Sequence, residues 1–200
     1  MEKLERYKGE LSLEQMILAH KKIVENAKSL YEDATLLYKN KKFPRAYFLM
    51  CIANEELGKS IIVLSSIIDL ILEDVDWHQF WKLLRNHKDK TSMIEYAENI
   101  FVSSEDNFMP PQIISKLIPT FEELKMASLY SDMFQENFFQ PNEIIPEQLA
   151  SSYLKLTGNR IKFFSSVALS DDTIKSIKRD DILRYREKLH KMLQEYRDKC

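Results

Sequence analysis

Glycine and proline are scarce in this sequence: only 3 glycines and 6 prolines occur among 200 residues. Average usage is roughly 7% and 5%, and sandwiches, barrels and doubly wound folds need glycine at many of their turns. Gly9, Gly58 and Gly158 stand alone in the sequence, so it contains no glycine-rich loop of the Rossmann or P-loop type. These absences favour an all-α fold, and we expect a single-domain helical bundle.

Sequence motifs for metal binding and for serine catalysis are also missing. Of the two cysteines, Cys51 falls within a helical pattern and Cys200 ends the chain, and no Cys-x-x-Cys or His-Glu-x-x-His occurs. The Glu-x-x-His spacing of di-iron bundles occurs once, at Glu187 and His190, and no serine sits in a nucleophile elbow. We expect no metal and no cofactor, and the unpaired cysteines fit a reducing cytoplasm.

Neither a strong net charge nor a long apolar run is present. With 29 basic and 31 acidic side chains the formal charge is -2, so no overall field draws this chain to nucleic acid. The most apolar run, residues 61–72, is interrupted by Ser65, Ser66 and Asp69 and is shorter than the roughly 20 residues of a membrane span. The N-terminal residues are charged, unlike a signal peptide. We expect a cytoplasmic protein without membrane contact.

Basic side chains are nevertheless concentrated in three places. The longest is the C-terminal stretch 175–199, which carries nine basic and five acidic side chains. The other two are Lys39, Lys41, Lys42 and Arg45, and then Lys82, Arg85, Lys88 and Lys90, which are opposed only by Asp89. Two interpretations remain open: these are solvated helix faces, or they are local surfaces that bind an anionic partner.

Helical periodicity and capping residues predict about six helices, without repeats or low-complexity linkers. Ser12 and Gln15 form a capping box, Pro44 occupies the favoured first helical position, and Asp76 caps the third helix. The expected helices span about 13–40, 44–73, 77–101, 119–138, 147–169 and 171 to the C-terminus, with a loop at Pro110 and Pro111, breaks at Pro141 and Pro146, and an interruption near Arg179.

The second expected helix carries charges at the centre of an otherwise apolar sequence. Apolar residues occur on all its faces, which is typical of a helix buried in a bundle, yet Glu55, Glu56, Gly58 and Lys59 lie at its midpoint. Buried charges must be paired or neutralised. Either Glu55 and Lys59 form an internal pair that joins helices, or they belong to a polar functional site. Gly58 costs roughly 1 kcal/mol relative to alanine, which suggests close packing of a neighbouring backbone or side chain.

His87 borders the apolar face of the third expected helix and is surrounded by Arg85, Lys88 and Lys90. A histidine in this position is either a structural residue with satisfied hydrogen bonds or part of an anion site. Without a metal or serine motif, the chemistry that remains is metal-free attack on a phosphodiester. In that reaction a histidine moves protons, and cationic side chains stabilise the charge on the phosphorus oxygens.

Three short motifs follow one another along the chain. They are Ala53-Asn54-Glu55-Glu56-Leu57-Gly58-Lys59, His87-Lys88-Asp89-Lys90 and Leu129-Tyr130-Ser131-Asp132, preceded by Asn26-Ala27, Leu30, Asp33-Ala34, Leu37 and Ala46 and accompanied by Phe80, Lys125, Phe139 and Pro141. In this order they resemble the AbiV family of bacterial abortive-infection proteins, which belongs to the HEPN superfamily. The resemblance covers about residues 20–146, which we expect to form the core of one domain, 1–200, completed by C-terminal helices in 147–200.

The resemblance implies a helical bundle that forms a homodimer and, as in many HEPN proteins, a metal-independent ribonuclease. The usual HEPN signature is an arginine followed one to two helical turns later by a histidine. This sequence departs from it, because a single residue separates Arg85 from His87, and the conforming pair, Arg184 and His190, lies outside the region of resemblance. We place the catalytic site at His87, Arg85 and Lys90, with a supporting polar cluster of Glu55, Glu56, Lys59, Lys88, Lys125, Tyr130 and Asp132.

The leading hypothesis is an effector that blocks phage multiplication after activation by a phage-encoded protein, through RNA cleavage or translation arrest. His87 would act as acid or base, while Arg85 and Lys90 would bind phosphate. Glu55 and Lys59 would orient the site.

Two other hypotheses belong to different functional classes. A non-catalytic binding module would dock on a phage protein or on the translation machinery, and Lys41 and Lys42 would then matter more than His87. A structural dimer would use aromatic surfaces such as Phe134, Phe138 and Phe139.

Overall fold

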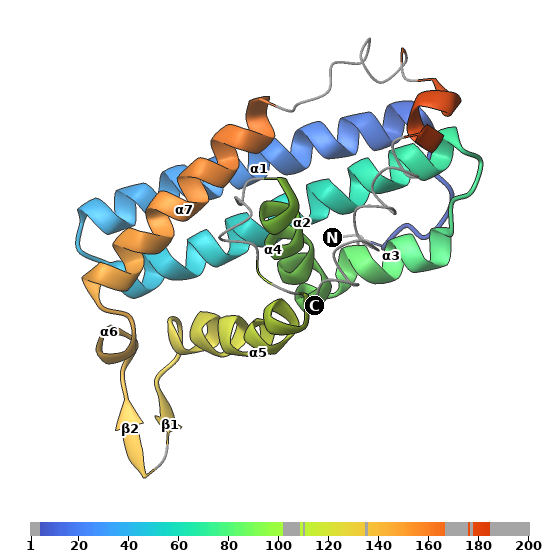
Figure 1. The fold of residues 1–200 in the computed structure, drawn as a ribbon. Helices are drawn as coiled ribbons and strands as arrows, with labels where there is room; N and C mark the ends of the chain where they lie inside the picture. Colours follow the sequence, from blue (N-terminus) through green and yellow to red (C-terminus); the bar gives the residue numbers. More distant parts are fainter. Residues whose placement is uncertain are drawn as a thin grey trace.

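α-Helices make up nearly all of the structure, a computed structural model that describes residues 5–101, 109, 111–134, 136–166, 176 and 178–184. Within these residues the strands are confined to one two-stranded hairpin. The expected all-α bundle is confirmed. Its elements, in order along the chain, are α1 Leu13–Lys39, α2 Phe43–Ile71, α3 Trp77–Arg85, α4 His87–Phe101, α5 Pro111–Ala127, β1 Asp132–Phe134, β2 Asn137–Phe139, α6 Pro141–Ile144 and α7 Glu147–Ser166 (Figure 1).

α1 and α2 form a long antiparallel pair in the bundle (Figure 1). The expected capping box opens α1: the Ser12 hydroxyl accepts the Gln15 N–H at 3.3 Å, and the Gln15 side chain accepts the Ser12 N–H at 2.8 Å. α1 ends in a tight turn where Lys41 adopts a left-handed φ of 58°. Pro44 then lies in the first turn of α2, where its fixed φ suits a helix start. Both helices therefore begin where the sequence signals predict.

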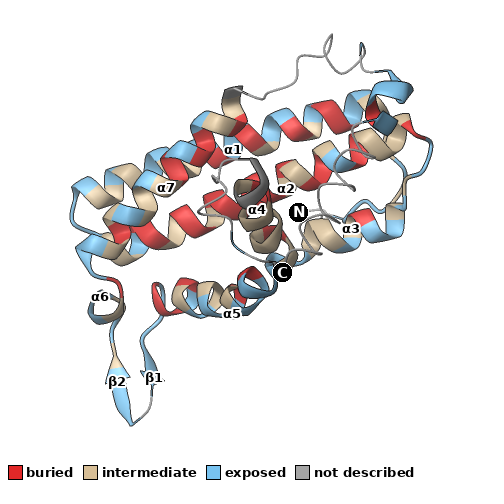
Figure 2. Ribbon diagram, in the orientation of Figure 1, coloured by how far each residue is buried: buried red, intermediate tan, exposed pale blue. Residues whose placement is uncertain are grey.

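α2 is buried along most of its length, and other helices pack around it (Figure 2). α7 packs against α1 and α2, while α4 packs against α2 and α5. Three apolar clusters follow one another along α2: Ala34, Ala46, Tyr47, Met50, Cys51, Ile145 and Ala150 near its start, Ala27, Leu57, Ile94, Ala97, Ile161 and Phe164 in the middle, and Met16, Ile17, Ile62, Val63, Ile67 and Phe80 near α3. The prediction of a central, buried second helix is confirmed.

The third expected helix, residues 77–101, is two helices in the structure. Asp76 caps α3 as expected and accepts the Gln79 N–H at 2.9 Å. The helix then breaks at Asn86, whose ψ of 122° is extended and whose side-chain oxygen accepts the Lys88 N–H at 3.0 Å. The prediction of one continuous helix is wrong, because the Asn86 side chain competes with helical hydrogen bonds and starts α4 instead.

The prediction of a helix over 119–138 is also wrong. α5 begins earlier, at Pro111, which suits a first helical turn, and it continues through Pro119 to Ala127. The loop expected at Pro111 is therefore helical. β1 and β2 then pair antiparallel, with Met133 opposite Phe138. Aromatic residues fit a strand as well as a helix, so short-range periodicity could not separate the two.

The region after the hairpin agrees in part with the sequence expectation. The short helix α6, between Pro141 and Pro146, was not expected, whereas α7 begins at Glu147 as predicted and is described to Ser166. Residues 176 and 179–184 are helical. The rest of the expected sixth helix lies outside the described residues, as does Pro110. The helix number thus differs from about six, because one helix is split and α6 is added. Across the described chain, no helix combines the length and hydropathy that a membrane crossing requires.

The buried histidine of α1, His20, should make stability depend on pH. Its side chain is 4% exposed, its Nε2 has no hydrogen-bond partner among the described residues, and burial lowers its pKa. The unfolded chain, with a histidine pKa of 6.5, therefore takes up the proton more readily than the folded one. The free energy of unfolding therefore keeps its full value above pH 6.5 as far as His20 is concerned. At lower pH it should decrease by up to about 1.4 kcal/mol per pH unit.

Urea unfolding between about pH 7.5 and 5.5 tests this dependence. His20→Gln should flatten the pH slope, whereas His78→Gln, at an exposed position of α3, should keep the wild-type slope. A His20→Gln variant with the full wild-type slope would assign the effect to another group.

Candidate functional site

A carboxylate buried inside the bundle, Glu55, lies among three cationic or titratable side chains. Its side chain is 5% exposed. Oε1 accepts a hydrogen bond from Lys125 Nζ at 2.7 Å, and Oε2 lies 2.6 Å from His87 Nδ1 and 3.3 Å from Lys90 Nζ. Burial alone would raise the pKa of the Glu55 carboxyl, but the hydrogen bonds from Lys125 and His87 outweigh it and hold this pKa below its usual value. Glu55 is therefore ionised at neutral pH.

Three helices supply this group of side chains, which we call the Glu55 cluster. Glu55 lies in α2, His87 and Lys90 lie in the first turn of α4, and Lys125 lies in α5. Lys125 Nζ also donates to Glu122 Oε2 at 2.5 Å. Burial would lower the pKa of Lys125, but Glu122 and Glu55 raise it above its usual value. The cluster therefore ties α2, α4 and α5 together through compensated charges.

The approach of α4 to α2 depends on Gly58. A Cβ atom at this position would lie 2.1 Å from the carbonyl oxygen of Lys90, well inside van der Waals contact. The glycine thus lets the first turn of α4 touch α2 close to Glu55, and this contact brings His87 and Lys90 to the carboxylate. The close packing that the sequence suggested at Gly58 is confirmed, and a backbone carbonyl makes it.

The imidazole of His87 combines a buried partner with access to solvent. Its side chain is 63% exposed, whereas that of Glu55 is 5% exposed. An ionised carboxylate can only accept, so His87 Nδ1 carries the proton in their contact. Lys90 Nζ, 3.4 Å from the same nitrogen, is also a donor and so makes no hydrogen bond to it. In the neutral ring Nε2 is then an acceptor, and the arrangement suits acid–base catalysis.

The two charges beside Glu55 on α2 pair differently from the sequence expectation. Lys59 forms an ion pair with Glu56, and this pair is separate from the Glu55 cluster. The internal Glu55–Lys59 pair is therefore not formed, because Glu55 finds its partners on α4 and α5. Among the expected site residues, the structure brings together Glu55, His87, Lys90 and Lys125.

The remaining expected site residues lie elsewhere. Arg85 Nη2 donates to the Tyr7 carbonyl at 2.8 Å, and its guanidinium lies over the ring of Trp81. Lys88 is exposed beside His87. Tyr130 is 55% exposed, and Asp132 lies in β1, where its carboxylate accepts the Met133 N–H at 2.7 Å.

Sequence reasoning missed Glu122 and its contact with Thr91. Thr91 Oγ1 donates to Glu122 Oε1 at 3.0 Å, which extends the cluster from α5 back to α4. The available signal was the spacing of three residues between Glu122 and Lys125, which places opposite charges on one helix face.

A second buried network joins α7 to α2 and α4. Arg160, 3% exposed, donates to Asn54 Oδ1 at 3.0 Å and to Glu95 Oε2 at 2.9 Å, and it also pairs with Glu98. Asn54 Nδ2 in turn donates to Thr157 Oγ1 at 3.0 Å. Burial, together with the nearby charge of Glu98, raises the pKa of Glu95 above its usual value despite the opposing effect of Arg160. Every charge here has a partner, so the network fixes how the helices pack.

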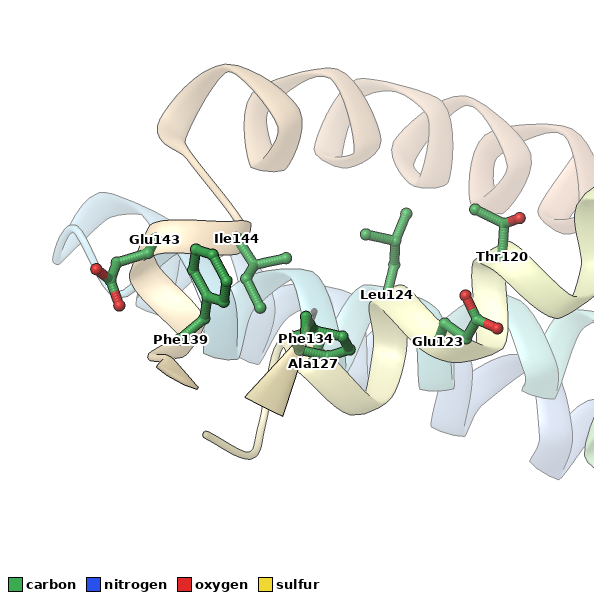
Figure 3. Close-up of a pocket in the computed structure, with 8 residues that line it drawn as sticks. All are labelled: Thr120, Glu123, Leu124, Ala127, Phe134, Phe139, Glu143 and Ile144. Atoms are coloured by element: carbon green, nitrogen blue, oxygen red, sulfur yellow. The ribbon is translucent and has the colours of Figure 1, made fainter. Parts of the chain in front are cut away.

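An apolar cavity of about 310 Å³ lies apart from the Glu55 cluster. Figure 3 shows its lining from α5, the hairpin and α6: Thr120, Glu123, Leu124, Ala127, Phe134, Phe139, Glu143 and Ile144. Apolar cavities are often binding sites, but this lining includes no basic or histidine side chain. The Phe134 and Phe139 rings, whose centroids lie 6.3 Å apart, instead contact each other across the two strands of the hairpin.

Other reactive groups are less suited to chemistry than His87. Cys51 is buried, and burial raises the pKa of its thiol to about 12, so it stays protonated at neutral pH. Over the residues that the structure describes, no three His, Cys, Asp or Glu side chains are arranged to hold a metal ion. The exposed acid–base group of the Glu55 cluster is therefore His87.

Comparison with known proteins identifies the family. The helical fold fits a domain of the HEPN class, and the model of the AbiV family of HEPN domains matches residues 15–162. The chain belongs to the AbiV family, and this membership points to abortive-infection defence. The curated proteins and the solved structures gave no match.

The contact at Gly58 predicts a stability difference between two glycine variants. Gly58→Ala should lower the free energy of unfolding by more than about 2 kcal/mol, because the Lys90 carbonyl cannot move without α4. In Gly158→Ala the new Cβ would meet the Tyr31 hydroxyl at 2.5 Å, the far end of a movable side chain. That change should stay within about 1 kcal/mol. Urea unfolding measures both, and equal losses would contradict the role given to Gly58.

The Glu55 cluster predicts that the carboxylate of Glu55 contributes more to the free energy of unfolding than that of its neighbour Glu56. Glu55→Gln leaves Lys90 and Lys125 buried without their shared counter-charge and should lower the free energy of unfolding by about 3 kcal/mol or more. Glu56 pairs with Lys59, whose side chain is 26% exposed, so the matched Glu56→Gln change should cost about 1 kcal/mol or less. Denaturant unfolding at neutral pH compares them. A Glu55→Gln variant as stable as wild type would show that the lysines do not depend on this carboxylate.

Proposed function

We propose that this protein defends the cell against phage by cleaving RNA without a metal ion, with His87 as the acid–base group. One observation carries the proposal: the exposed imidazole of His87 is held at 2.6 Å by the buried carboxylate of Glu55. The carboxylate keeps the proton on Nδ1, which leaves Nε2 as the basic atom for a substrate. Membership of the AbiV family supports the defence role.

The reaction would be an internal transfer on the RNA strand. His87 Nε2 takes the proton of a ribose 2′-hydroxyl, and the 2′-oxygen attacks the neighbouring phosphorus. The bond from phosphorus to the 5′-oxygen breaks, and this oxygen leaves with a proton from water. The products are a 2′,3′-cyclic phosphate and a 5′-hydroxyl, and His87 returns its proton to water.

The cationic side chains would divide between two roles. Lys90 and Lys125 are buried against Glu55, so they would position the carboxylate and, through it, the imidazole. Lys88 is exposed at the N-terminal end of α4, where the helix dipole also favours an anion, and it would face the phosphate. Arg85 would join it only after leaving the Tyr7 carbonyl.

Activation and assembly follow from the same proposal. The protein would stay inactive until a phage-encoded protein binds, and it would act as a homodimer in the cytoplasm. Its target would be RNA, either free or in the translation machinery.

A second candidate is a binding module without catalysis, and the hairpin favours it. β1 and β2 project away from the bundle (Figure 1), and they expose Met133 by 64% and Phe138 by 68%. Apolar side chains on such a projection fit docking on a protein surface, for instance on a phage protein. In that case the Glu55 cluster would serve the fold alone.

RNA integrity during phage infection separates the two candidates. Cells with wild-type protein should accumulate discrete RNA fragments that end in 2′,3′-cyclic phosphate. His87→Ala should reduce cleavage by about 100-fold or more, the usual contribution of a general acid or base. His78→Ala provides a matched control, because His78 is an exposed histidine of α3 outside the cluster.

Both variants must first match the wild type in helical content and thermal stability. If His87→Ala protects cells fully and wild-type protection leaves RNA intact, the cleavage mechanism is wrong and the binding module replaces it.

A further inference from the structure

A second concave site lies at the turn between α1 and α2, and we call it the basic pocket. Its volume is about 350 Å³. Lys41, Lys42, Pro44, Arg45, Ser128, Leu129, Gln140, Pro141 and Asn142 line it. Three of these side chains are cations, and none is a carboxylate. A concave surface with this lining suits an anionic ligand.

The cations of the basic pocket have no counter-charge within the described chain. The buried cations Lys90, Lys125 and Arg160 all pair with carboxylates. Lys41, Lys42 and Arg45, by contrast, form no ion pair with any described carboxylate, and all three are exposed. Their positive potential is therefore available to a ligand.

The backbone adds to this potential. α2 begins at Phe43 without a side-chain cap, and within the described residues no acceptor binds the N–H groups of Phe43 and Arg45. The positive end of a 29-residue helix thus lies at the same place as the three cations. Phosphate is the anion for which helix ends and Lys or Arg side chains are most often combined.

The basic pocket is connected to the Glu55 cluster through two helices. Lys125, in the last turn of α5, binds Glu55, and Ser128, the residue that follows the end of α5, lines the pocket. In α2, Arg45 precedes Glu55 by ten residues, which corresponds to about 15 Å along the helix. An extended RNA strand covers this distance within a few nucleotides. Leu129, 39% exposed, and Pro141 add apolar surface beside the cations, against which a ribose or base can pack.

We propose that the basic pocket binds a phosphate group of the RNA strand whose cleaved bond lies at His87. The inference deepens the proposed function and rests on it: the pocket would set the strand's position, while His87 moves the proton. Because the two sites are separate, binding can be measured without cleavage.

Fluorescence anisotropy with 2′-O-methyl RNA tests the pocket alone, because the blocked 2′-oxygen cannot attack. A series from a dinucleotide to a dodecamer should show a gain in affinity once the strand reaches both sites. The double variant Lys42→Gln/Arg45→Gln should bind the dodecamer at least about 10-fold more weakly. Its plot of log affinity against log salt should become shallower by about 1.4, the value for two lost phosphate contacts on a single strand. Lys41→Asn removes the third charge while tolerating the left-handed φ.

The matched control is Lys22→Gln/Lys28→Gln, which removes the same charge from exposed positions of α1. It should change affinity by less than about 2-fold. Equal losses in the two double variants, or no binding by the wild type, would overturn the proposal. Competition by a mononucleotide or inorganic phosphate as effective as the dodecamer would assign the pocket to a small phosphorylated ligand, and the RNA assignment would then be wrong.

His87→Ala distinguishes this inference from the proposed function. It should fail to cleave RNA while keeping the pocket's contribution to affinity, so that Lys42→Gln/Arg45→Gln weakens binding of the 2′-O-methyl dodecamer by the same factor in this background as in the wild type. If wild-type protein binds through the pocket but leaves unmodified RNA intact, the cleavage mechanism fails and the pocket stands. If the variant without the pocket cations cleaves RNA as fast as the wild type, the role proposed for the basic pocket is wrong and the cleavage mechanism remains.

Discussion

The contact of the α4 backbone with Gly58 is the constraint on which the rest of the molecule depends. The Lys90 carbonyl occupies the space that any other side chain would need, so α4 is fixed against α2 at the level of Glu55. From there His87 and Lys90 reach the carboxylate, and Lys125 reaches it from α5. The backbone contact and the buried charges require each other, since an unpaired carboxylate would not be tolerated inside the bundle.

Two adjacent residues of α2 bind side chains from different helices of the bundle. Asn54 faces Arg160 of α7, whereas Glu55, one step of 100° around the helix, faces α4 and α5. One network surrounds a buried carboxylate with cations, and the other surrounds a buried guanidinium with carboxylates. α4 contributes to both, with Lys90 to the first and Glu95 to the second. It is therefore the helix through which a change at one network would reach the other.

Features set by local patterns could be predicted from the sequence, and those set by distant partners could not. The buried α2 and the close packing at Gly58 followed from periodicity and from the helix cost of glycine. The choice of Lys125 over Lys59 as a partner of Glu55 depends on how α5 packs, which no spacing along α2 reveals. The break at Asn86 carried a capping signal that an apolar pattern on both sides concealed, and the hairpin was mistaken for helix because short aromatic segments suit both.

The link between Arg160 and α2 also has a consequence for how the chain is made. Asn54, Glu95 and Glu98 are synthesised well before Arg160, the residue that joins them. Before α7 has been synthesised, Glu95 and Glu98 lack their cationic partner Arg160, and the side of α2 that packs against α7 is not covered. The bundle can therefore be completed only after α7 has been synthesised. A nascent chain stopped before α7 would contain α2, α4 and α5 but would lack Arg160, which links α7 to α2 and α4.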